Sequence, residues 1–189
     1  MVEKIISIDK QLLVFLNGLG SENFDSFWLM VTKQFSWTPL FLLVFFILLK
    51  KIGWKQLGIV LVFVSLLILV SDQTANLVKY STQRLRPCND PQIMTVIRIV
   101  QDRDTFGFFS GHATSSMACA VFLFSLFKQH FKFPFLFFLF PFIFAYSRIY
   151  LGLHFPLDIL TGYFFGIVYG LCFSAAYQSL RPKYFSFPV

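Results

Sequence analysis

Residues 57–79, LGIVLVFVSLLILVSDQTANLVK, carry no charge in their first two thirds and become increasingly polar afterwards. A helix needs roughly 20 predominantly apolar residues to cross the hydrocarbon core of a bilayer. This stretch has that length. It therefore predicts a membrane-spanning helix whose polar residues gather near one membrane surface.

The composition of the whole chain agrees with a membrane location. Hydrophobic residues make up 57% of the 189 residues, charged residues only 13%, and mean hydropathy is +0.70. Soluble domains are about 25% charged, so these residues could not form the water-exposed surface of a soluble domain. A disordered chain is excluded as well, because disorder needs few apolar side chains and many charges. The net charge is +7, but no long basic run is present. A membrane surface or an anionic substrate is therefore favoured as the partner over nucleic acid.

Further apolar stretches predict an all-α, polytopic transmembrane bundle formed by one domain, residues 1–189. Before them, residues 9–34 form a weaker amphipathic region broken at Gly18-Leu19-Gly20, typical of helices in the membrane interface. We therefore divide the chain into interfacial helices in 1–35 and a catalytic core in 55–178. With 57–79 the bundle has five spans, and a sixth is possible; the other four are 37–49, 111–127, 133–149 and 157–177.

The basic residues predict how the bundle is oriented. Positive charges in short loops are retained in the cytoplasm, and Lys50–Lys55, Lys128–Lys132 and the tail at 181–183 are such segments. The long segment 80–109 and the turn 150–155 then lie outside, although the long segment also carries arginines. We expect a multi-pass protein of the bacterial cytoplasmic (inner) membrane, with these outer segments facing away from the cytoplasm.

Ionisable residues gather at the outer ends of the predicted spans, where they are costly and therefore indicate function. Asp72, Asn76 and Lys79 follow each other at i, i+4 and i+7, so one helical face carries them. A polar contact between helices is the alternative for the first two. Lys79 is followed by Arg86-Pro87, which adds a second cation in the loop that leaves the helix.

Two more groups lie at the same face. Ser110-Gly111-His112 starts a span, where backbone N–H groups and the helix dipole favour an anion. Arg148 ends the next span, and His154 is followed four residues later by Asp158, which can hold one imidazole nitrogen as N–H. Guanidinium groups match phosphate geometry. Neither Asp72 nor Asp158 belongs to a metal-ligand cluster, so no metal and no other cofactor is expected.

Lys79-x6-Arg86-Pro87, Ser110-Gly111-His112 and Ser147-Arg148-x5-His154-x3-Asp158 together resemble the three-part signature of the type 2 phosphatidic acid phosphatase family. The resemblance covers about residues 55–178. One departure is Phe109, where the family usually has proline. The resemblance implies that His154 attacks phosphorus, that Asp158 orients it, and that His112 protonates the leaving oxygen and then activates water. The residues implied to bind phosphate are Lys79, Arg86, Ser110, Gly111 and Arg148.

The resemblance implies a lipid phosphate or diphosphate in the bilayer as substrate. An outward-facing site in a small bacterial protein favours undecaprenyl diphosphate, with phosphatidylglycerophosphate, phosphatidic acid and lipid A phosphates as alternatives. A small anion transporter subunit is the alternative outside enzymes. It is disfavoured because transport needs polar residues along a path through the membrane, whereas the inner halves of the spans are apolar and aromatic.

Overall fold

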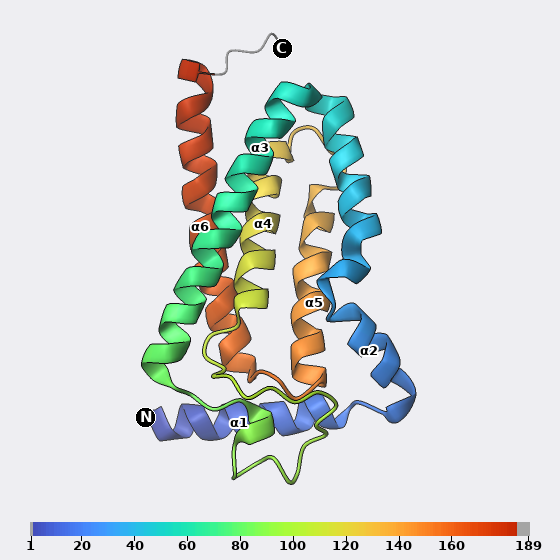
Figure 1. The fold of residues 1–189 in the computed structure, drawn as a ribbon, viewed down its shortest axis with the longest axis vertical. Helices are drawn as coiled ribbons and strands as arrows, with labels where there is room; N and C mark the ends of the chain where they lie inside the picture. Colours follow the sequence, from blue (N-terminus) through green and yellow to red (C-terminus); the bar gives the residue numbers. More distant parts are fainter. Residues whose placement is uncertain (1, 185–189) are drawn as a thin grey trace.

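The computed structural model describes residues 2–184, which are all-helical and contain no strand. This confirms the predicted all-α fold. Short 3₁₀ segments join or extend the α-helices (Figure 1). The α-helices are α1 (Val2–Gly18), α2 (Asp25–Val31), α3 (Thr38–Thr82), α4 (Gly111–Phe127), α5 (Leu139–Tyr150) and α6 (Pro156–Tyr184).

Helix α3 contains the second predicted span and all of the first except its first residue, Trp37, which ends the preceding 3₁₀ segment. Its two arms are separated at Gly53, whose φ of 73° and ψ of 171° are non-helical; only glycine adopts such a conformation readily. In Figure 1 the first arm rises and the second arm descends, so α3 is a helical hairpin. The turn is tied to the next basic loop, because Nζ of Lys51 donates to the carbonyl of His130 over 2.7 Å.

The remaining predicted spans also form helices. They are α4, α5 extended by the 3₁₀ segment Pro134–Phe138, and α6. Two helical stretches within the described residues, Gln34–Asn89 and Pro156–Leu180, are long and apolar enough to cross a membrane, whereas those at Gly111–Phe127 and Pro134–Tyr150 are shorter. The positions of the helices therefore agree with the expectation, while the number of crossings stays a prediction.

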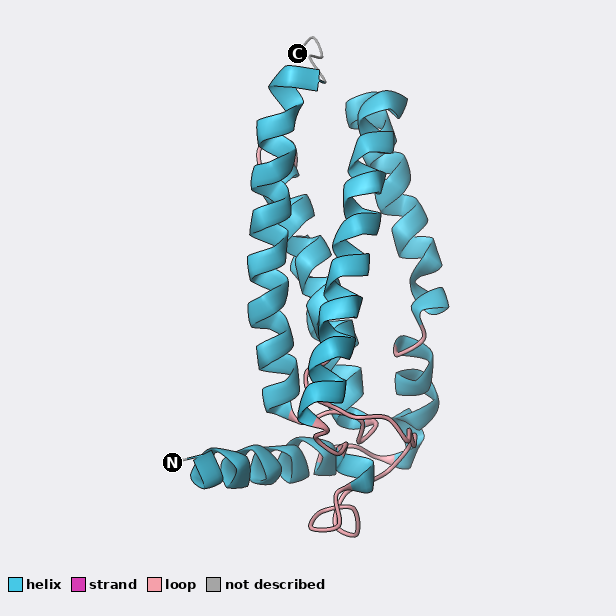
Figure 2. Ribbon diagram, turned by 60° about the vertical axis from the view of Figure 1, so that its left-hand side comes forward, coloured by secondary structure: helices cyan, strands magenta, loops and turns pink. Residues whose placement is uncertain are grey.

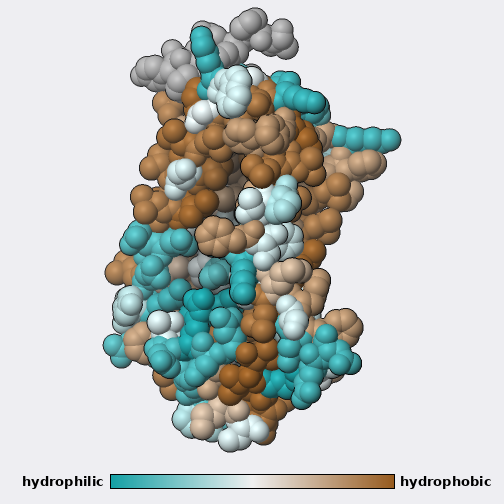
Figure 3. Space-filling model, turned by 45° about the vertical axis from the view of Figure 1, so that its right-hand side comes forward, coloured by the Kyte–Doolittle hydropathy of each residue, from teal (hydrophilic) through white to brown (hydrophobic). Residues whose placement is uncertain are grey.

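The outer surface of the bundle is apolar, as a membrane protein requires. Val62 on α3 is 57% exposed, and Phe164 and Leu171 on α6 are 63% and 53% exposed. In Figure 3 the upper part of the bundle is mostly brown, and hydrophilic residues gather lower down and at the upper tip. Apolar surface of this extent would be a liability in water, but it matches lipid chains.

A row of glycines on α6 brings that helix close to α4. A Cβ on Gly162 would lie 2.8 Å from the carbonyl oxygen of Ser110, and one on Gly166 would lie 2.7 Å from that of Thr114. Small residues at such positions let two helix backbones approach within a membrane. The close packing places the start of α6 beside the start of α4, where two of the three motifs lie.

The N-terminal region forms α1 and α2, which are interrupted after Gly18, at the predicted break; α1 begins at Val2, earlier than the predicted amphipathic region. Figures 1 and 2 show α1 lying across the lower end of the bundle, roughly at right angles to α3–α6. Its buried Asn17 side chain donates to the carbonyls of Ile149 and Tyr150 over 3.2 and 2.9 Å. Helix α2 packs Trp28 on the ring of Tyr150. Both helices therefore contact the end of α5.

Candidate active site

The three motifs meet at the lower end of the bundle, where α3 and α5 end and α4 and α6 begin (Figure 1). This is the end opposite Gly53 and the Lys51–His130 contact. The three motifs meet because successive helices run in opposite directions. The ends of α3 and α5 therefore lie at the same end of the bundle as the starts of α4 and α6.

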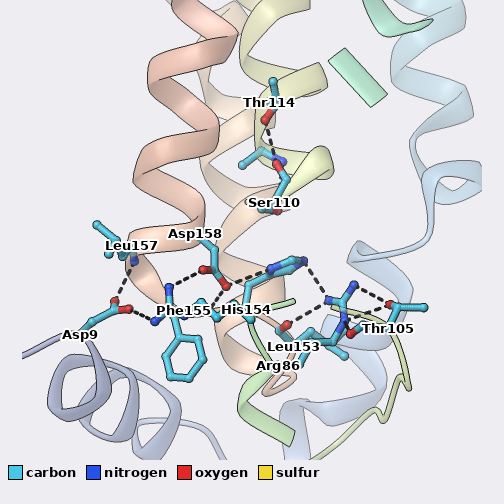
Figure 4. A network of polar contacts seen from close by, with 12 residues as sticks. Asp9, Arg86, Thr105, Ser110, Thr114, Leu153, His154, Phe155, Leu157 and Asp158 are labelled. Carbon is cyan, nitrogen blue, oxygen red and sulfur yellow. Dashed lines mark hydrogen bonds and ion pairs between the residues drawn. The ribbon is translucent and has the colours of Figure 1, made fainter. Parts of the chain in front are cut away.

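His154 lies at the centre of the cluster, buried in the loop between α5 and α6. Its Nδ1 is 3.3 Å from Oδ2 of Asp158, and its Nε2 is 3.0 Å from Nη1 of Arg86 (Figure 4). An arginine only donates, so Nε2 accepts and Nδ1 carries the hydrogen toward the carboxylate. Burial, with the nearby charges of Arg86 and Arg148, holds the pKa of His154 well below its ordinary value of 6.5.

Helix α6 starts at Pro156, so His154 lies in the loop just before its first turn. The contact with Asp158 forms nevertheless, because the loop folds back over the first turn. Oδ2 of Asp158 also accepts from the backbone N–H of Phe155 over 2.9 Å. The carboxylate is completely buried, and these donors compensate for its removal from water.

Arg86 is fixed by partners on both sides. Nε donates to the carbonyl of Thr105 over 2.8 Å, Nη2 donates to its Oγ1 over 3.0 Å, and Nη1 also lies 3.0 Å from the carbonyl of Leu153 (Figure 4). The guanidinium is therefore held in one orientation beside His154.

Arg148, in the last turn of α5, is buried and only partly satisfied. Nη1 donates to Oγ1 of Thr32, whereas Nε and Nη2 have no hydrogen-bond partner among the described residues. Buried donors without partners are costly. Two such donors on one guanidinium suit the oxygens of a phosphate group.

Lys79 reaches the start of α4. A Cβ placed on Gly111 would lie 3.8 Å from Nζ of Lys79 and 3.6 Å from Oδ1 of Asp72, so the lysine and the backbone at Gly111 face the same space. Ser110 is the N-cap of α4, and its Oγ accepts from the N–H of Ala113.

His112 lies in the first turn of α4, with its ring 5.2 Å from that of Phe144. Among the described residues, the imidazole has no hydrogen-bond partner, so both of its nitrogens remain available to a ligand.

A cavity of about 200 Å³ opens beside these groups, and the long segment 80–109 supplies part of its wall. Arg103 is the notable addition. Its backbone carbonyl accepts from Nδ2 of Asn89 over 2.9 Å, while its side chain is exposed. It adds a further cation to the wall. The cavity is lined by Asn76, Lys79, Tyr80, Arg86, Arg103, Thr105 and Phe106.

Phe109 takes the place of the family's proline before Ser110. It is fully buried and stacks on Phe165 of α6, with ring centroids 4.9 Å apart. The loop before α4 is therefore held by aromatic packing.

The structure brings together all eight residues singled out from the sequence, and it adds others that the motifs do not contain. No group of three or more His, Cys, Asp or Glu side chains suited to a metal ion is found within residues 2–184. Arg84 lies inside the first motif, and its charge was the available signal; Asp9 and Thr32 belong to the segment that we assigned to interfacial helices. The added residues are Asp9, Thr32, Arg84, Arg103 and Thr105.

Comparison with protein-family models matches residues 56–182 to the PAP2 superfamily. Among curated proteins, a lipid A 4'-phosphatase of Bacteroides thetaiotaomicron is 37% identical over 170 residues, covering 88% of this chain and 75% of the relative. A lipid A 4'-phosphatase of Porphyromonas gingivalis is 26% identical over 186 residues, covering 97% and 78%.

Two solved structures share the fold. A transmembrane PAP2 type phosphatidylglycerolphosphate phosphatase from Bacillus subtilis has a TM-score of 0.71 at 16% identity, covering 97% of this chain and 90% of its own. LpxE of Aquifex aeolicus has a TM-score of 0.60 at 20% identity, covering 86% and 92%. At these identities the likeness concerns the fold.

Proposed function

The chain belongs to the PAP2 superfamily and is a membrane lipid phosphatase, and from this premise we propose that it removes a phosphate from lipid A. The two lipid A 4'-phosphatases support this choice, because they match nearly the whole chain. Undecaprenyl diphosphate, which the sequence favours, becomes the main alternative; phosphatidylglycerophosphate and phosphatidic acid are further ones. Family membership removes the transporter alternative.

In the first step, Nε2 of His154 attacks phosphorus while the bond to the lipid oxygen breaks. Asp158 accepts the hydrogen bond from Nδ1–H and stabilises the positive charge that forms on the ring. Phosphoryl transfer depends mainly on positioning and charge stabilisation. The groups that hold the phosphate oxygens are the side chains of Lys79, Arg86, Arg148 and Ser110 and the N–H of Gly111.

His112 supplies the proton that the lipid oxygen needs as it leaves. In the second step the same imidazole takes a proton from water, whose oxygen attacks the phosphohistidine. The N–P bond breaks, inorganic phosphate leaves, and His154 is neutral again. The His112 ring packs on Phe144, and its nitrogens have no hydrogen-bond partner among residues 2–184, which supports this role.

The observation that carries the proposal is that Arg148 lacks hydrogen-bond partners among residues 2–184 for two of its buried donors, Nε and Nη2. The charge of Arg148, like that of Arg86, also helps to lower the pKa of His154. A tetrahedral dianion between these groups would satisfy the donors and present phosphorus to Nε2.

The proposal includes a membrane arrangement. The two arms of α3, together with α4, α5 and α6, provide five crossings, and α1 lies in the interface. Supporting this, the basic turns around Lys51 and Lys128 share one end of the bundle and the site lies at the other. By the positive-inside rule, the site faces the extracytoplasmic side of the inner membrane.

The direct test is phosphate release by purified protein in detergent. Lipid A, undecaprenyl diphosphate, phosphatidylglycerophosphate and phosphatidic acid are compared side by side, with and without EDTA, and His154→Ala serves as the inactive control. We expect lipid A to have the highest kcat/KM and EDTA to leave it unchanged. Preference for undecaprenyl diphosphate would establish the alternative, and loss with EDTA that Mg²⁺ restores would contradict metal independence.

A further inference from the structure

We propose that the N-terminal helix controls the nucleophile: Asp9 on α1 and Arg84 are positioning residues that act through Asp158 on His154. The inference rests on the proposed role of His154. It also places a functional residue outside residues 56–182, the region matched by the family model.

Arg84 joins two carboxylates that come from distant parts of the chain. Nη1 is 2.7 Å from Oδ1 of Asp158, and Nη2 is 2.6 Å from Oδ2 of Asp9. The guanidinium also lies 4.2 Å from the centre of the Phe155 ring. One planar group with two forked donors is therefore shared between α1 and α6.

This bridge determines which oxygen of Asp158 faces the imidazole. With Oδ1 held by Arg84, Oδ2 is left for Nδ1 of His154 and for the N–H of Phe155. A carboxylate that is free to rotate would present either oxygen, and the ring of His154 would follow it. Arg84 thus keeps Nε2 aimed in one direction.

Asp9 fixes Arg84 in turn. The carboxylate is buried on α1, and its Oδ1 accepts from the N–H of Leu157 in the first turn of α6 over 2.8 Å (Figure 4). Asp9 therefore contacts the same turn that carries Asp158. Without its charge, Arg84 would have one carboxylate instead of two, and its partly exposed side chain would have more freedom.

The alternative to a positioning role is a purely structural one, in which Asp9 only attaches α1 to the bundle. The neighbouring residue provides the matched control. Nζ of Lys10 is 2.5 Å from Oδ2 of Asp90 and also donates to Gln92, so this ion pair ties α1 to the outer segment without contacting Arg84 or Asp158. Lys10→Gln removes a tether alone.

The experiment measures phosphoenzyme formation from an activated aryl phosphate, in single turnover, for Asp9→Asn and Lys10→Gln. Asparagine keeps an acceptor for the N–H of Leu157 and removes the negative charge that Asp9 presents to Arg84. We expect Asp9→Asn to lower the maximal rate of phosphoenzyme formation roughly tenfold or more, because the loss of a residue that orients a functional histidine has effects of this size. The aryl phosphate concentration that gives half the maximal rate should stay within about twofold of the wild-type value. Lys10→Gln should change neither by more than about twofold.

Asp158→Asn makes the test specific. If Asp9 acts through Asp158, Asp9→Asn has little further effect in the Asp158→Asn background, because coupled residues are non-additive. An equal loss in both backgrounds, or an Asp9→Asn protein that behaves like Lys10→Gln, would overturn the inference. If Asp9→Asn does not fold, Arg84→Lys, which cannot bridge two carboxylates as a fork does, takes its place. Phosphoenzyme that persists in His154→Ala would instead overturn the proposed function and this inference with it.

Discussion

Arg86 holds Nε2 of His154, with its Nη1 3.0 Å away. The nitrogen that we propose as nucleophile is thus occupied by a group that we propose to bind phosphate. An arginine donates more strongly to a phosphate dianion than to a neutral imidazole. We expect the entering phosphate to accept this Nη1 hydrogen bond in place of the imidazole while the guanidinium keeps its orientation, so that Nε2 becomes free when phosphorus arrives.

The low pKa of His154 sets the pH range of the first step. The neutral ring is the reactive form, and burial lowers the pKa well below 6.5. As the pH falls, the ring therefore stays neutral through 6.5 and gains its proton only below that value. In His112→Ala, the rate of phosphoenzyme formation from an activated aryl phosphate should stay level down to about pH 6.5. A midpoint at or above 6.5 would show that His154 is not shifted in this way.

The close packing of the glycine row on α6 predicts that an added methyl group lowers stability at Gly166 but not at Gly58, which lies on α3. A Cβ on Gly166 would lie 2.7 Å from the Thr114 carbonyl oxygen, so Gly166→Ala should destabilise the protein by about 1–3 kcal/mol. Gly58 on α3 has nothing within 4 Å of its ideal Cβ, and Gly58→Ala should be neutral or stabilising by about 0.5–1 kcal/mol. Thermal unfolding in detergent compares them; equal shifts would contradict the close packing of α4 and α6.

Arg103 is expected to act on binding. Its exposed side chain lines the cavity beside Lys79 and Arg86, and an exposed charge contributes about 1 kcal/mol or less. Arg103→Ala should raise KM for a lipid phosphate about fivefold at low salt, less at high salt, with little change in kcat. Lys128→Ala, at the opposite end, is the control. A loss confined to kcat would place Arg103 in the chemical step.

The sequence predicted the helices and the ends at which the motifs meet, because both depend on local features. Apolar run lengths define the spans, and spans of alternating direction bring Lys79, His112 and Arg148 to one end. Contacts across the chain were not predictable in the same way. The ion pair of Asp9 and Arg84 joins residues 75 positions apart, and the Arg148–Thr32 hydrogen bond joins residues 116 positions apart.

Because of these contacts, the role that we propose for the N-terminal segment goes beyond the predicted place in the membrane interface. No periodicity distinguishes Asp9 from the other polar residues of α1; its role depends on how α1 crosses the bundle. The spacing of Gly162, Gly166 and Gly170, in contrast, was a readable signal for close helix packing.

Labelling with an impermeant thiol reagent tests the orientation. Cys88 in the outer segment is only 6% exposed and is a poor target, so a cysteine is placed at Val96, which is exposed in the same segment. Val96→Cys should react in intact cells, and Lys128→Cys only after the membrane is opened. Wild type controls for the native cysteines. The reverse pattern would place the site in the cytoplasm.

Trapping the phosphoenzyme tests the central claim most directly. In His112→Ala the second step lacks its base, so an activated aryl phosphate, whose leaving group needs no proton, should phosphorylate the protein and leave it phosphorylated. Mass spectrometry of this protein is expected to find the phosphate on His154, and His154→Ala should yield neither phosphoenzyme nor turnover. Phosphate on another residue, or full turnover by His154→Ala, would contradict the account.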